Sequence, residues 1–151
     1  MDLLNPNLPL DLDDPEWRIY SRNPGMPPHY LAATAQVQNS LMAEGCTIAG
    51  RVEGSVIFAG VTVEEGAEVT HSILMPGTVV KKNARVRYAI AAEDTVIEED
   101  AQVGESPEEC DDLTKWGVAV VASRVQVGAG AMVAAGSMLE NDLQKEGKAH
   151  A

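Results

Sequence analysis

A seven-residue pattern returns every seventeen positions in the middle of the chain. Its three copies are VEEGAEV, VKKNARV and IEEDAQV, at residues 63–69, 80–86 and 97–103. Aligned on this shift, each column keeps one chemical type, as Val63, Val80 and Ile97 do. Self-similarity at a fixed period is typical of proteins in which each repeat packs mainly on its neighbours.

Turn residues recur with the same period. Two columns hold glycine, asparagine or aspartate, the residues that adopt positive φ most readily. These columns are Gly66, Asn83 and Asp100, and Gly60, Gly77 and Asp94. Aliphatic residues fall about six apart between such corners, whereas a helix needs apolar residues three and four apart. The pattern therefore predicts short strands and tight corners, closed into triangular coils that stack about 4.8 Å apart as a parallel β-helix.

The register predicts five to six coils over residues 31–151, an all-β domain. It extends backwards through one coil that is shortened by two residues near Arg51, and it returns late in the chain. The residues expected inside the early coils are Leu31, Val37, Leu41, Ile48, Val52 and Val56, followed by Ile73 and Ile90. The late inward positions are Val121, Val127, Val133 and Leu139. One Phe, two Trp and three Tyr leave an aliphatic core.

The charges of the repeat change sign in its middle copy. Stacking at a 17-residue shift gives one column of Glu64, Lys81 and Glu98 and a second of Glu65, Lys82 and Glu99. Unlike charges on adjacent strands stabilise the pairing, so we expect an ion-pair ladder, with Arg85 above Glu68. A phosphate-binding patch of Lys81, Lys82, Arg85 and Arg87 is the functional alternative.

Composition limits the partners. Eleven Lys and Arg against 23 Asp and Glu give a net charge of -12, which repels nucleic acid and anionic membranes. The first residues, MDLLNPNLPLDLDD, have neither the positive flank nor the apolar core of a signal peptide. We therefore expect a cytoplasmic chain that binds no nucleic acid and no membrane.

The histidines and cysteines provide few candidates for metal binding or catalysis. His29, His71 and His150 are spaced so that they cannot share one metal ion within a protomer, and we expect no metal site. His71, expected as a solvated strand residue, is the one candidate general base of an acyltransferase. Cys46 is interpreted as a small core residue and Cys110 as the more reactive thiol.

Three further segments interrupt the repeat. Residues 1–30 form a Pro-rich lead-in that cannot be a continuous helix, yet it carries Trp17, Ile19 and Tyr20, which we expect to dock on another domain or subunit. Residues 105–117, ESPEECDDLTKWG, predict an exposed acidic loop. Ser137 and Glu140 have capping-box spacing and favour a short C-terminal helix; otherwise the chain frays after Leu139.

The strings VGAGAM and VAAGSM, residues 127–138, resemble the hexapeptide repeat, which implies a left-handed β-helix. PEWRIY, NSLMAEGC and SILMPGTVV together resemble the C-terminal domain of bacterial ADP-glucose pyrophosphorylase, also called glucose-1-phosphate adenylyltransferase. The likeness is greatest to the regulatory-type subunit of glycogen synthesis in Gram-positive bacteria. That family makes ADP-glucose from ATP and glucose 1-phosphate, and it implies as partners an N-terminal nucleotidyltransferase domain and neighbouring subunits.

The family's Gly-rich phosphate loop and Mg²⁺-binding aspartates have no match in this chain. We therefore expect no catalytic residue and no cofactor here, and a role in assembly and regulation; a stand-alone hexapeptide acyltransferase is the alternative. Effector-sensitive relatives carry an Ile-Asp-Arg run where this chain has Ala92, Glu93 and Asp94. Because carboxylates repel phosphate, we expect no binding of sugar bisphosphate or nucleoside monophosphate.

Overall fold

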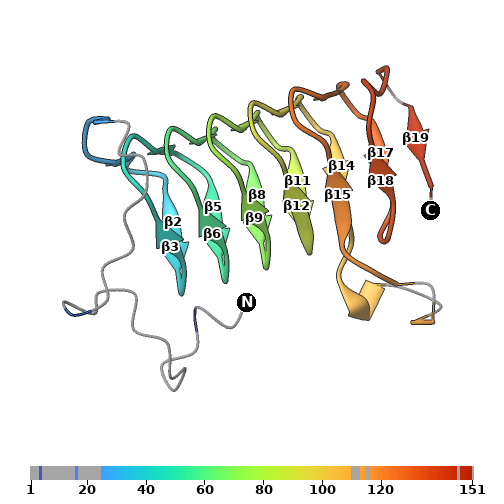
Figure 1. Ribbon diagram of the computed structural model, residues 1–151, viewed down its shortest axis with the longest axis horizontal. Helices are drawn as coiled ribbons and strands as arrows, with labels where there is room; N and C mark the ends of the chain where they lie inside the picture. The colour runs from blue at the N-terminus through green and yellow to red at the C-terminus, as the bar shows by residue number, and fades with distance from the viewer. Residues whose placement is uncertain are drawn as a thin grey trace.

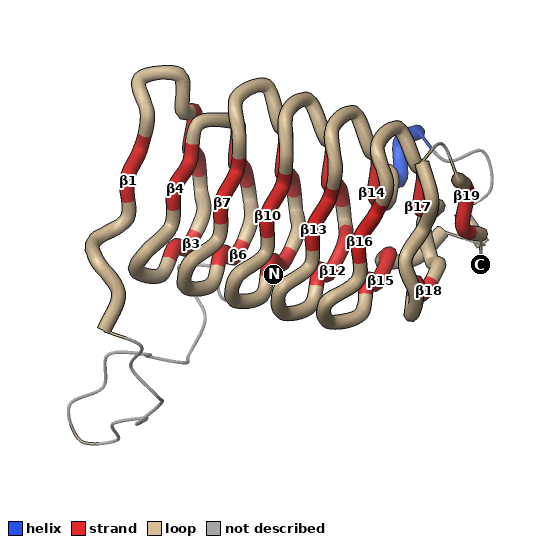
Figure 2. Tube along the Cα trace, turned by 90° about the horizontal axis from the view of Figure 1, so that it is seen from above, coloured by secondary structure: helices blue, strands red, loops and turns tan. Residues whose placement is uncertain are grey.

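The chain winds into a triangular solenoid of short parallel strands. The computed structural model describes residues 4, 16, 25–109, 113–114, 116–145 and 147–150. Figure 1 shows successive turns stacked along the long axis, and Figure 2 shows one side of the prism with its strands in series. Every strand pairs in parallel with the equivalent strand of the next turn, so three sheets run the length of the molecule.

The strands are two or three residues long, because the chain turns a corner after each side of the triangle. Sheet A contains β1 (Tyr30–Leu31), β4 (Thr47–Ile48), β7 (Thr62–Val63), β10 (Val79–Val80), β13 (Val96–Ile97) and β16 (Gln126–Val127). Sheet B contains β2 (Gln36–Gln38), β5 (Arg51–Glu53), β8 (Glu68–Thr70), β11 (Arg85–Arg87), β14 (Gln102–Val103), β17 (Met132–Val133) and β19 (Lys148–Ala149). Sheet C contains β3 (Leu41–Met42), β6 (Val56–Ile57), β9 (Ile73–Leu74), β12 (Ala89–Ala91), β15 (Ala119–Val121) and β18 (Met138–Leu139).

The predicted parallel β-helix with a period of about 17 residues is confirmed. Val63 pairs with Val80 and Val80 with Ile97, each one turn further along. The shortened coil is confirmed as well, since Ile48 pairs with Val63, fifteen residues away. The short side requires Gly50, because a Cβ there would clash with the carbonyl oxygen of Ala67.

The predicted core of sheet C is wrong by one residue in β3, β6, β9 and β12, whereas Val121 and Leu139 in its last two strands are buried as predicted. In each apolar pair the second residue, not the first, points inward: Ile57, Leu74 and Ala91 are buried. Their neighbours Val56, Ile73 and Ile90 are only half-buried and face outward, as does Leu41. A coil is thus made of two six-residue sides and one five-residue side, and that five-residue side shifts the inward position.

The predicted corners are confirmed. Gly66, Asn83 and Asp100 have φ values of 77°, 56° and 58°. Gly60, Gly77 and Asp94 have φ values of 72°, 74° and 55°. These positions let the chain turn sharply without the steric cost that most side chains would meet there.

The solenoid has about seven turns rather than five or six, because it begins at β1 and its last, partial turn ends at β19. No helix forms over the described residues 137–145 and 147–150, so the prediction of a C-terminal helix is wrong. Ser137 is buried beside β18, Leu143 bridges to Val127, and β19 adds a strand to sheet B. Pairing with the neighbouring turn overrides the local capping motif. Because the chain still pairs at Leu143 and at β19, the alternative prediction that it frays after Leu139 is wrong as well.

Residues 107–109 form η2 (Pro107–Glu109), a single turn of 3-10 helix in the loop after β14. Within the described part of the chain no helix has the length and hydropathy needed to cross a bilayer. Most of the lead-in at residues 1–30 lies outside the described residues, and from Gly25 to His29 the chain is exposed.

Candidate functional site

The first charged column lies on the corner between sheets A and B. Lys81 Nζ lies 2.8 Å from a carboxylate oxygen of Glu98, and this pair bridges adjacent turns. Glu64, one turn earlier, accepts a hydrogen bond from the backbone N–H of Lys82 at 3.1 Å. The bond from Lys81 is the main reason that the pKa of Glu98 lies below its ordinary value of 4.5. In return, Glu98 raises the pKa of Lys81.

The second charged column is more open. Glu65, Lys82 and Glu99 are exposed, and within the described ranges no ion pair joins them. The structure therefore brings Lys81 and Glu98 together and leaves the side chain of Lys82 in solvent. Lys81 is already bonded to a carboxylate, which reduces what it could offer a phosphate.

The acidic loop at 105–117 is tied to sheet B by an arginine. Arg87 Nη1 donates to both carboxylate oxygens of Glu109 at 2.6 Å, and Arg87 also lies 3.7 Å from Glu68. The strand register places Arg85 opposite Glu68, but the ion pair is made by Arg87. The bond from Arg87 is the main cause of the lowered pKa of Glu109.

An aromatic stack covers the corner between sheets B and C. The His71 and Tyr88 rings are parallel with centroids 4.8 Å apart, and Trp116 meets Tyr88 edge-on at 5.4 Å. The Trp116 indole N–H donates to the carbonyl of Glu105 at 3.0 Å, which fastens the end of the acidic loop. The placement of His71 on a strand is wrong: it occupies a corner at φ 48°, and Tyr88 does the same at φ 47°.

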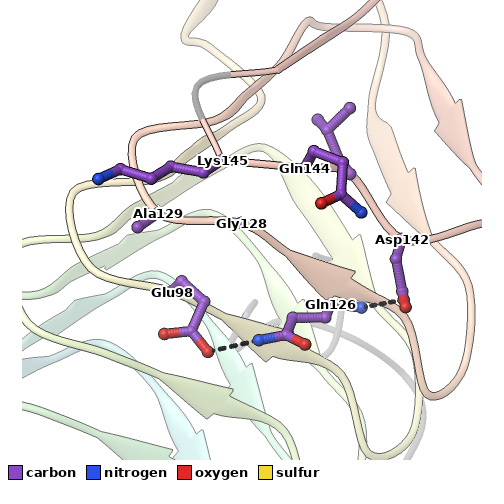
Figure 3. Close-up of a pocket in the computed structure, with 8 residues that line it drawn as sticks. Glu98, Gln126, Gly128, Ala129, Asp142, Gln144 and Lys145 are labelled. Atoms are coloured by element: carbon purple, nitrogen blue, oxygen red, sulfur yellow. Dashed lines mark hydrogen bonds between the residues drawn. The ribbon is translucent and has the colours of Figure 1, made fainter.

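A shallow hollow of about 290 Å³ lies beside the last partial turn. Figure 3 shows Glu98 and Gln126 on its floor with Asp142, Gln144 and Lys145 around it. Glu98 accepts from the Gln126 side-chain amide at 2.7 Å, and Asp142 accepts from the Gln126 backbone N–H at 2.8 Å. The bond to Asp142 and the bridge between Val127 and Leu143 cover the edge of β16, so Asp142 is engaged in ending the sheet.

Cys46 is buried, and its thiol donates to the carbonyl of Phe58 at 3.1 Å. Burial raises the pKa of that thiol, which suits a core residue better than a nucleophile. Cys110 lies outside the described residues. No cluster of three metal-ligating side chains occurs over the ranges that the structure describes.

The predicted docking residues Trp17, Ile19 and Tyr20 also lie outside the described residues. The sequence did not reveal two features of the surface: the Arg87–Glu109 pair, and the outward aliphatic residues of sheet C. The second carried a signal, namely that each sheet C strand holds two adjacent apolar residues of which only one can face inward.

The triangular prism, its 17-residue period and its aliphatic columns define the chain as a β-helix of the hexapeptide-repeat class. More specifically, the chain belongs to the GlmU-like, C-terminal hexapeptide family, whose sequence profile matches residues 29–121.

Glucose-1-phosphate adenylyltransferases are similar in sequence to part of the chain. Those of Bacillus thuringiensis (strain Al Hakam) and Bacillus anthracis are each 56% identical to it over 69 residues, 46% of this chain. The match spans 18% of the length of either relative, so the chain corresponds to a small part of those enzymes.

Two solved structures share the fold. A putative acetyltransferase from Bacillus cereus superposes with a TM-score of 0.56 at 13% identity, covering 78% of this chain and 68% of its own. A hexapeptide transferase family protein from Anaplasma phagocytophilum superposes with a TM-score of 0.57 at 19% identity, covering 81% and 76%. At these identities the likeness shows the fold, and it matches the predicted left-handed β-helix.

Proposed function

We propose that this chain is a non-catalytic C-terminal β-helix domain of a glucose-1-phosphate adenylyltransferase subunit of the regulatory type. It acts in subunit assembly and regulation for glycogen biosynthesis, in the cytoplasm. The observation that carries the proposal is the 56% identity to adenylyltransferases over 69 residues, which far exceeds the identity to any fold relative described above.

The proposed partners are an N-terminal nucleotidyltransferase domain and neighbouring subunits. Trp17, Ile19 and Tyr20 are the proposed contacts from the lead-in, because three large apolar side chains in a Pro-rich segment gain most from burial against another surface. The inter-turn pairs such as Lys81 with Glu98 help to hold the register of the solenoid.

The proposal is tested with a fragment of the Bacillus anthracis enzyme that lacks the stretch matching this chain. We expect this chain to co-elute with the fragment and to raise its rate of ADP-glucose formation. A triple alanine variant at Trp17, Ile19 and Tyr20 should lose both effects, while a control variant, Gln36→Ala on the exposed side of β2, should keep them.

The second candidate, a stand-alone acyltransferase, is favoured only by the fold likeness. Titration of the chain with acetyl coenzyme A distinguishes the two. We expect no saturable heat; saturable binding that is lost in His71→Ala, together with no effect on the adenylyltransferase fragment, would replace the proposal by the acyltransferase.

A further inference from the structure

The last residues of the lead-in continue the hydrogen-bond ladder of the solenoid. The backbone N–H of Gly45 donates to the carbonyl of Pro27 at 2.7 Å. One turn later the N–H of Gly60 donates to the carbonyl of Glu44 at 3.1 Å, at the same position of the coil. Pro27 and Glu44 are 17 residues apart, which is the period of the repeat. The chain just before β1 therefore already lies in register with the solenoid.

Glycines leave a bare groove on the corner between sheets C and A, and Met26 fills it. Gly45, Gly60 and Gly77 occupy this corner in successive turns, with φ values of 73°, 72° and 74°. A Cβ added at Gly45 would lie 2.9 Å from Sδ of Met26, and one added at Gly60 would lie 3.0 Å from Cε of Met26. At Gly77 the corresponding space is taken by the carboxylate of Asp94. The groove is therefore two turns long, and one methionine side chain covers both turns.

Packing of Met26 is the main apolar contribution that this stretch can make to its own attachment. The other residues from 25 to 29 are Gly25, Pro27, Pro28 and His29, and the stretch is exposed. The two prolines have no N–H group, so they cannot donate to the ladder. Met26 is 38% exposed, so more than half of its surface is covered. A long, unbranched thioether suits an irregular groove of this kind.

The thioether also makes this contact sensitive to oxidation. Because Met26 is partly exposed, a peroxide in solvent can reach it. Hydrogen peroxide transfers one oxygen atom to the sulfur: the O–O bond breaks, an S–O bond forms, the sulfur loses two electrons and water is released. The sulfoxide is larger and polar, whereas Sδ of Met26 lies so close to Gly45 that even a Cβ there would crowd it. The oxidised side chain therefore cannot keep the same seat in the groove.

We propose that Met26 is a reversible oxidation site, which fastens the lead-in to the solenoid as the thioether and releases it as the sulfoxide. Trp17, Ile19 and Tyr20 precede Met26 by six to nine residues. Met26 thus fixes the point from which these three side chains reach a partner. This consequence rests on the proposed function, whereas the fastening of the lead-in does not.

Met138 is the matched control among the methionines. It is 67% exposed on β18, so peroxide oxidises it at least as readily as Met26. β18 and β3 are the two ends of sheet C, and Figure 1 shows them at opposite ends of the solenoid. Oxidation of Met138 therefore accompanies that of Met26 without touching the glycine groove.

Amide hydrogen exchange in the full chain, resolved for single residues by NMR, tests the fastening. The Gly45 amide reports the bond to Pro27. The Gly77 amide, which donates to Ala59 at 3.1 Å, is the reference inside the solenoid. Exchange is measured before treatment with hydrogen peroxide, after it, and after repair by the two methionine sulfoxide reductases, one for each sulfoxide epimer. Mass spectrometry gives the extent of oxidation at each methionine.

Three variants assign the effect to one side chain. Met26→Leu keeps an apolar side chain that peroxide does not oxidise, Met26→Gln is of similar length but polar, and Met138→Leu removes the control site. We expect peroxide to accelerate Gly45 exchange at least about tenfold in the wild type and in Met138→Leu, and less than about twofold in Met26→Leu. Met26→Gln should exchange fast without peroxide, and repair should restore slow exchange in the wild type. Gly77 exchange should stay within about twofold throughout.

Either of two results overturns the proposal. One is unchanged Gly45 exchange in wild-type chain whose Met26 is fully oxidised. The other is equal acceleration by peroxide in the wild type and in Met26→Leu, which would place the sensitive group elsewhere.

Binding of the Bacillus anthracis fragment described above tests the consequence for docking. The chain is oxidised alone, and the peroxide is removed before mixing. We expect oxidation to weaken binding at least about fivefold in the wild type and less than about twofold in Met26→Leu. If the fragment does not bind the reduced chain while Gly45 still responds to peroxide, the proposed function fails and the fastening stands. If the fragment binds both forms equally although Gly45 responds, the link between Met26 and the docking residues is overturned.

Discussion

Adjacent residues on β9 give a sharp test of which side chains form the core. Leu74 is 0% exposed and stacks between Ile57 and Ala91, whereas its neighbour Ile73 faces outward and is half-buried. Leu74→Ala leaves a cavity that the small Ala91 cannot fill. We therefore expect the free energy of unfolding to fall by about 4 kcal/mol, near the upper part of the usual range for such a substitution. Ile73→Ala removes only partly buried surface, at about 1 kcal/mol.

Urea denaturation and thermal melting, each monitored by circular dichroism, measure the free energy of unfolding and Tm of both variants. For a chain of this size each kcal/mol lowers Tm by about 2–4 °C, so Leu74→Ala should melt roughly 8–16 °C lower and Ile73→Ala only a few degrees lower. A cost of Ile73→Ala equal to or greater than that of Leu74→Ala would contradict the assignment of Leu74 as the inward residue and Ile73 as the outward one.

Three other predictions concern corners, effectors and pH. Gly66→Val should cost more than about 1 kcal/mol because φ is 77° there, while Gly66→Asn should be mild since Asn83 holds the equivalent corner; equal melting temperatures would contradict the corner assignment. Calorimetric titration with fructose bisphosphate and with AMP should give no saturable heat below about 1 mM, and a saturable signal for either would refute the electrostatic reasoning. The Glu109–Arg87 pair should stabilise the acidic loop fully above pH 4.5 and weaken as pH falls through the lowered pKa of Glu109. Amide exchange over residues 105–109 should accelerate there, and exchange that does not change with acidification, once corrected for the intrinsic rate, would argue against that pair.

Period and corners could be predicted from the sequence because only a few residue types adopt positive φ. Gly66, Asn83 and Asp100 recur at such a corner, and the strand register follows from their spacing. The direction of the sheet C residues could not be predicted in the same way. Where two aliphatic residues are adjacent, as in Ile73 and Leu74, hydrophobicity does not distinguish the buried one from the exposed one.

The errors at the C-terminus and at the aromatic corner have separate causes. Ser137 and Glu140 satisfy a local helix motif, but the backbone N–H groups of Val120 and Ala122 donate to the carbonyls of Ser137 and Leu139 and so pair β18 with β15. A short isolated helix is only marginally stable, so the strand pairing prevails. His71 and Tyr88 occupy a positive-φ corner, where a glycine is more usual, and their ring stack helps to hold them there. The candidate site depends on tertiary contacts such as Arg87 with Glu109, which are 22 residues apart and follow no repeat.

Sedimentation velocity tests most directly whether this chain is a docking domain of an adenylyltransferase subunit. The measurement mixes the chain with the Bacillus anthracis fragment at equal concentrations of about ten times a micromolar Kd. The predicted result is a single faster boundary that contains both proteins. It separates again with the triple alanine variant at Trp17, Ile19 and Tyr20, and it persists with the control Gln36→Ala. Two independent boundaries for the wild-type mixture, each at the position of its protein alone, would contradict the proposed function.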